Sequence, residues 1–174
     1  MEFGLLMLRV ILAALLFGHA TQKVFGWFRG QGARGTAASF EAWGLRPGLP
    51  FVILSSCSEL VGATLIVLGA LVPLGATIVV GTMFVAVAYN FRHGIWAHQG
   101  GYEVALVYGL LAVVLAATGP GGWSIDYLLG LSWFHGAAWA GGALVVGVLG
   151  AQGPLALRRA GMKKAAEPEA GLAR

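Results

Sequence analysis

The chain has little charge and almost no cysteine. Asp, Glu, Lys and Arg make up 10% of its 174 residues, whereas soluble domains carry about 25%. Cys57 is the single cysteine, so the chain can form neither an intrachain disulfide nor a dithiol redox couple. Enzymes that work through paired thiols are therefore excluded.

The residues that replace charge are apolar. Hydrophobic residues make up 58% of the chain, and the mean hydropathy is +0.80. A bilayer core of about 30 Å requires about 20 apolar residues per helix, so the length of such a chain sets a number of spans. The net charge of +4 comes from basic residues in the loops and the tail, where membrane topology places them. We expect a protein that contacts membrane lipid and binds no nucleic acid.

Hydropathy predicts an all-α membrane protein in which residues 1–151 form one transmembrane helical bundle. Pro73 is expected to begin the third span, because the first turn of a helix does not need its N–H. The predicted spans are residues 5–28, 51–72, 74–91, 102–119 and 128–151.

Two segments outside the spans are also assigned. Residues 36–43 predict a short helix at the membrane interface, capped by Thr36 and anchored by Phe40 and Trp43. Residues 152–174 are rich in Lys, Arg, Ala and Glu and are expected to form a flexible basic tail, because they lack the apolar content to fold.

Five spans would place the two termini on opposite sides of the membrane. Because cytoplasmic loops are enriched in Lys and Arg, the basic side is expected to be cytoplasmic and the N-terminus outside. If residues 128–151 only lie on the surface, four spans remain and the tail changes sides. The basic residues on the shared side are Lys23, Arg29, Arg34, Arg46, Arg92, Arg158, Arg159, Lys163 and Lys164.

Small residues recur in the last predicted span at a spacing that lets helices approach closely in lipid. We favour packing inside the bundle as their purpose, and a homo-oligomer contact stays open. These residues are Gly136, Ala137, Ala138, Ala140, Gly141 and Gly142.

Glu59 is an acid inside a predicted span. A mid-helix carboxylate costs about 2.5 to 3.5 kcal/mol on membrane-insertion scales, so Glu59 should face inward and find a partner. At 1.5 Å per residue, Glu59 and His19 lie about 12 Å and 9 Å from the same side of the membrane. Lys23 shares a helix face with His19. His19 and Lys23 are the expected partners, and Glu59 is either a structural tie between helices or a ligand or proton site.

Other polar residues lie near the same side, because the spans that carry them end there. The candidates for a ligand or proton site are His19, Lys23, Glu59, Tyr89, Asn90, Tyr102 and Glu103. A metal site built from His93, His98 and Glu103 is disfavoured, because the loop between them has no diagnostic ligand spacing, and no metal is expected. Near the opposite side, Arg9 is expected to form a structural ion pair with Asp126.

Several stretches together resemble one family. They are LRVILAALLFGHATQKVFGWFRGQGARGTAASFEAWGL, SSCSELVGATLIVLG, GGYEVALVYGLLAV and GPGGWSIDYLL, which cover about residues 5–130. In this order they resemble the DoxX family of small bacterial membrane proteins. The resemblance implies a four-helix transmembrane bundle with a polar first loop in the bacterial plasma membrane, to which residues 128–151 add a fifth helix. The motif positions it carries over are Arg9, His19, Lys23, Gly26, Trp27, Phe28, Glu59, Gly101, Tyr102, Glu103 and Asp126.

The resemblance also implies a role in oxidoreductase systems. We expect an accessory or anchoring membrane subunit that presents its basic side to a soluble or membrane redox protein and holds a quinone or other small ligand in an intramembrane polar pocket. One alternative is a membrane enzyme that uses Glu59 and His19 as an acid and base pair. Another is a small transporter or lipid-binding scaffold.

Overall fold

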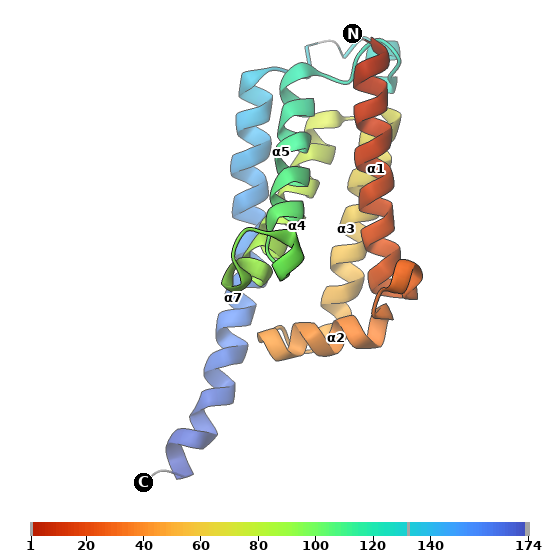
Figure 1. Cartoon of the computed structure of the whole chain (residues 1–174). Helices are drawn as coiled ribbons and strands as arrows, with labels where there is room; N and C mark the ends of the chain where they lie inside the picture. Colours follow the sequence, from red (N-terminus) through yellow and green to blue (C-terminus); the bar gives the residue numbers. More distant parts are fainter. Residues whose placement is uncertain (1, 132, 173–174) are drawn as a thin grey trace.

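The chain folds into a bundle of long helices. The computed structural model describes residues 2–131 and 133–172, with side chains as far as Lys163. Within these residues all regular structure is helical, which confirms the predicted all-α membrane bundle. Five helices lie side by side, and the two ends of the chain lie at opposite ends of the bundle (Figure 1). These helices are α1 (Glu2–Phe25), α3 (Gly48–Leu68), α4 (Val72–Asn90), α5 (Glu103–Thr118) and α7 (Ala137–Leu172).

Four of the five helices are long and apolar enough to cross a bilayer. They are α1, α3, α4 with its extension to His93, and α7 as far as Lys163. The fifth, α5, has 16 residues and therefore rises about 24 Å, somewhat less than the hydrocarbon thickness. It packs against α4 and α7 along the bundle. The chain is thus a multi-pass membrane protein.

The first connection differs from its prediction. Helix α1 ends at Phe25, where Gly26 adopts φ 73°, and the 3-10 turn η1 (Trp27–Arg29) follows. Helix α2 (Gly32–Trp43) begins four residues before the expected Thr36. The prediction that Thr36 caps it is wrong, because the Thr36 hydroxyl donates to the Lys23 carbonyl oxygen at 3.3 Å. The end of α1 thus supplies a closer partner for that hydroxyl, and α2 lies across the end of the bundle (Figure 1).

The C-terminal part also differs. Helix α7 begins at Ala137 rather than near residue 128, and a loop containing the single turn α6 (Ile125–Leu128) precedes it. The helix continues to Leu172, so residues 152–172, which the sequence predicted as a flexible tail, are helical. The physical reason is that Ala, Lys, Arg and Glu are strong helix formers, and extending a helix is much easier than starting one.

Helix α4 lies at the centre of the packing, in contact with α3, α5 and α7. Helix α7 approaches it closely through Gly147, where a Cβ atom would lie 2.8 Å from the Thr77 carbonyl oxygen. Ala140 and Ala143 are buried on the same side of α7. Gly141 and Gly142 have no neighbouring atom within 4 Å of a Cβ position. The small residues of this helix therefore serve packing inside the bundle in part, and some face outward.

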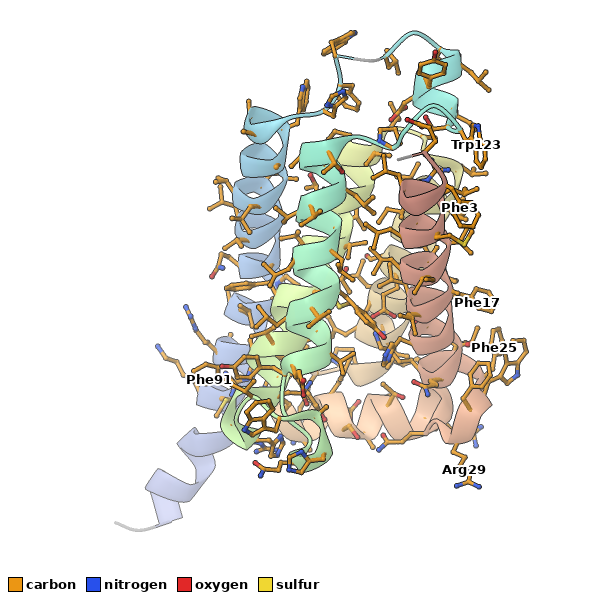
Figure 2. All side chains as sticks on the ribbon, turned by 45° about the horizontal axis from the view of Figure 1, so that its top comes forward. Phe3, Phe17, Phe25, Arg29, Phe91 and Trp123 are labelled. Atoms are coloured by element: carbon orange, nitrogen blue, oxygen red, sulfur yellow. The ribbon has the colours of Figure 1, made fainter. Side chains whose placement is uncertain are left out.

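The outer surface of the bundle is apolar. Phe3, Phe17 and Phe25 project from α1 away from the other helices (Figure 2) and are 63%, 47% and 65% exposed. The interior is filled by aliphatic side chains, among them the fully buried Leu12 and Leu115. Large apolar side chains on the outside of spanning helices suit contact with acyl chains, since lipid is as apolar as the protein core.

Candidate functional site

A buried ion pair joins α1 and α3. The Lys23 Nζ atom lies 2.6 Å from Glu59 Oε1, the length of a charge-assisted hydrogen bond. Glu59 is 2% exposed and Lys23 23% exposed. Lys23 stands in the last turn of α1, and Glu59 lies on the buried side of α3 together with Val52 and Ser56. The expectation that Glu59 faces inward toward a basic partner is confirmed, and the partner is Lys23.

The second oxygen of the carboxylate is not used by this pair. Glu59 Oε2 is buried and has no hydrogen-bond partner within the described residues, and the same holds for the Ser56 hydroxyl. Buried polar atoms in folded proteins are almost always hydrogen-bonded. An unpaired acceptor on a buried carboxylate is therefore a position where a donor from a bound molecule would be stabilised.

Glu59 lines a large cavity that extends from α2 along the bundle. The cavity has a volume of about 820 Å³, which is within the range of small-molecule sites. His19 and Lys23 of α1 also line it, and Phe40 and Trp43 of α2 close one end. Most of the lining is apolar. The polar side chains that line the cavity are His19, Lys23, Gln31, Thr36, Ser39, Trp43, Ser55, Ser58, Glu59, Thr77, Thr82, Tyr89, Asn90 and Tyr108.

Tyr89 and Asn90, both predicted for the site, come from the end of α4. Tyr89 packs edge-on against Trp43 of α2, with ring centroids 5.2 Å apart. The Asn90 side chain donates to the Ala86 carbonyl oxygen of its own helix at 3.1 Å. Both residues line the cavity at the end next to α2.

Tyr102 and Glu103 lie outside this cavity. The Tyr102 ring stacks on Phe91 at a centroid distance of 5.6 Å, and Glu103 Oε2 accepts a hydrogen bond from the Ala97 backbone N–H at 3.0 Å. Both residues hold the loop between α4 and α5, which contains the 3-10 turns η2 (Phe91–His93) and η3 (Ala97–Gln99). Tyr102 and Glu103 therefore stabilise this loop and do not line the cavity.

Arg9 is buried near the opposite end of the bundle, where it binds four backbone carbonyl oxygens. Its Nε donates to Ile66 at 3.1 Å and its Nη2 to Val67 at 2.9 Å, at the last turn of α3. Its Nη1 donates to Pro120 at 2.6 Å and to Trp123 at 2.9 Å. Arg9 therefore ties the last turn of α3 to the loop that follows α5.

Asp126 has a different set of partners. Its Oδ1 accepts from the Leu71 N–H at 2.7 Å and its Oδ2 from the Val72 N–H at 3.0 Å, at the start of α4. The predicted ion pair with Arg9 is wrong: the two side chains are not within salt-bridge distance. Backbone groups of the α3–α4 turn lie nearer to each charge, so the positive residue binds carbonyls and the negative one binds N–H groups.

Comparison with known proteins identifies the family. The model of the family described as DoxX matches residues 4–99, more than half of the chain. The chain belongs to the DoxX family. Neither the curated proteins nor the solved structures yielded a match.

The DoxX match covers α1 to η3 and therefore includes Arg9, His19, Lys23 and Glu59. Tyr108 lies beyond it and was not predicted for the site, although it lines the cavity and its ring packs edge-on against His19 at 5.6 Å. A signal was available in the sequence, because five residues into α5 correspond to about 7.5 Å of depth, close to that of His19.

Proposed function

We propose that this DoxX protein is an accessory membrane subunit of an oxidoreductase system and holds the head group of a quinol in the cavity beside Glu59. The observation that carries the proposal is the unpaired Oε2 of a carboxylate that is 2% exposed and lines a cavity of about 820 Å³. Inward ionisable groups in a membrane protein mark a functional site by default.

The donor and acceptor pattern favours the reduced head group. Lys23 already satisfies Glu59 Oε1, and Oε2 remains as an acceptor. A quinol hydroxyl can donate to this oxygen, whereas an oxidised quinone offers carbonyl acceptors only. His19 and Tyr108 line the same cavity and offer polar groups for the second oxygen of the ring.

The end of the bundle beside α2 supports the accessory role. Arg29, Arg34 and Arg46 are exposed there, and the basic residues of α7 follow on the same end (Figure 1). A cluster of exposed basic groups attracts an acidic protein surface and speeds encounter with it. We infer that this end faces the cytoplasm of a bacterial cell, with the N-terminus outside, because cytoplasmic loops carry the excess of Lys and Arg.

A binding measurement with a small hydroquinone tests the proposal. The probe is tetramethylhydroquinone, kept reduced, and its affinity for the purified protein in mild detergent is measured by calorimetry. A hydrogen bond to a charged acceptor contributes about 1.5 to 3 kcal/mol, so Glu59→Gln should weaken binding roughly ten- to hundred-fold. Glu103→Gln is the matched control and should leave the affinity unchanged, since Glu103 does not line the cavity. Failure of the wild-type protein to bind the probe, or equal affinity of Glu59→Gln, would refute the proposal.

A further inference from the structure

The cavity is elongated along the bundle. On α4 its lining runs from Asn90 to Thr77, thirteen residues that rise about 20 Å. The ionisable groups His19, Lys23 and Glu59 line it from α1 and α3. Between α3 and α7 the lining is mainly apolar and comes from three helices, in a part that we call the α3–α7 groove: Leu54, Ile78, Gly81, Val85, Val146 and Gly147.

The α3–α7 groove opens on the outer surface of the bundle. Leu54 of α3 is 54% exposed and Val146 of α7 is 57% exposed, although both line the cavity. Helix α3 packs on α1, α2 and α4, and helix α7 packs on α4 and α5, so α4 forms the back of the groove. Both exposed residues belong to helices long and apolar enough to span the membrane. The opening therefore faces acyl chains rather than water.

We propose that the ligand carries a single long apolar chain and enters sideways from the bilayer, with its chain lying in the α3–α7 groove. This inference rests on the proposed function for the head group and adds the class of ligand and its route. One continuous cavity contains both an unpaired acceptor and an apolar opening toward lipid. An amphiphile with a hydrogen-bond-donating head and an apolar chain matches both features at once.

Gly150 offers a way to block the groove without disturbing the fold. It lines the cavity, and a Cβ atom at this position would meet no other atom within 4 Å. Gly141 has the same free space but lies outside the cavity lining, nine residues earlier and so on the opposite side of the same helix. The two glycines form a matched pair for one substitution.

The experiment compares two probes in lipid nanodiscs. One is a quinol with a long isoprenoid chain, and the other is tetramethylhydroquinone, which has the head group alone. Gly150→Phe should weaken binding of the long-chain quinol at least ten-fold and leave tetramethylhydroquinone unchanged. Gly141→Phe should change neither affinity.

The outcomes separate the two proposals. If Gly150→Phe leaves the long-chain affinity unchanged, or weakens both probes equally, the chain does not lie in the groove, while the head-group proposal stands. If the wild-type protein binds neither probe, the proposed function fails and this inference with it. Disulfide-linked dimers of Val146→Cys in a Cys57→Ser background would show that a second copy covers the groove, which would also overturn the inference.

Discussion

Replacing Lys23 by methionine tests the central electrostatic contact of the bundle. Methionine keeps an unbranched side chain but removes the ammonium that meets Glu59 Oε1 at 2.6 Å. Glu59 is 2% exposed, so the variant leaves a carboxyl group in an apolar setting without its basic partner. Removing one partner of a buried pair destabilises a protein by about 3 to 5 kcal/mol. Because Lys23 is 23% exposed and partly screened, we expect a loss near the lower end, about 3 kcal/mol.

Unfolding in mixed detergent micelles measures this loss. Lys163→Met is the control, since Lys163 is exposed on α7 and its replacement should be close to neutral. In Lys23→Met/Glu59→Leu neither member of the pair remains, so part of the lost stability should return. The reasoning is refuted if Lys23→Met unfolds like Lys163→Met, or if the coupling between the two sites stays below about 0.5 kcal/mol, the usual limit of additivity.

Two further predictions concern the opposite end of the bundle. Arg9→Lys keeps the charge, but an ammonium cannot reproduce four hydrogen bonds to carbonyls of two segments. Because a hydrogen bond to a charged group contributes about 1.5 to 3 kcal/mol, we expect a loss of about 3 kcal/mol in the same unfolding assay. The exposed Arg92→Lys should be neutral. Gly69→Ala places a Cβ atom 2.5 Å from the Ser124 Cβ at φ +61° and should cost more than Gly130→Ala, which has a similar φ of +69° and free space. Equal losses for the two glycine variants would contradict the packing argument.

The ion pair of Glu59 could be predicted from the sequence. A carboxylate in hydrocarbon requires a partner, and helix rise together with the spacing of His19 and Lys23 placed the basic groups at its depth. The same depth argument placed Tyr102 nearby but could not follow the path of a loop. Tyr102 stands at the end of that loop and stacks on Phe91 instead.

The partners of Arg9 were beyond such reasoning. Opposite charges near one end of a bundle suggest an ion pair, and composition does not show which backbone groups a helical hairpin presents there. The α3–α4 turn presents carbonyls at Ile66 and N–H groups at Leu71, and these stand closer to Arg9 and Asp126 than the two side chains stand to each other. The extent of α7 was missed for a related reason, since hydropathy ends a span where helix propensity continues the helix.

The bonding of Arg9 sets an order on assembly in the membrane. Its carbonyl partners lie 57 to 114 residues later in the chain, so they do not yet exist when the first helix enters the bilayer. Arg9 is only seven residues from Glu2 at the start of α1, close enough for its long side chain to reach the lipid head groups in the meantime. Two of its partners are made with the end of α3 and the other two only with the loop after α5, so the full set of four bonds is completed late in assembly.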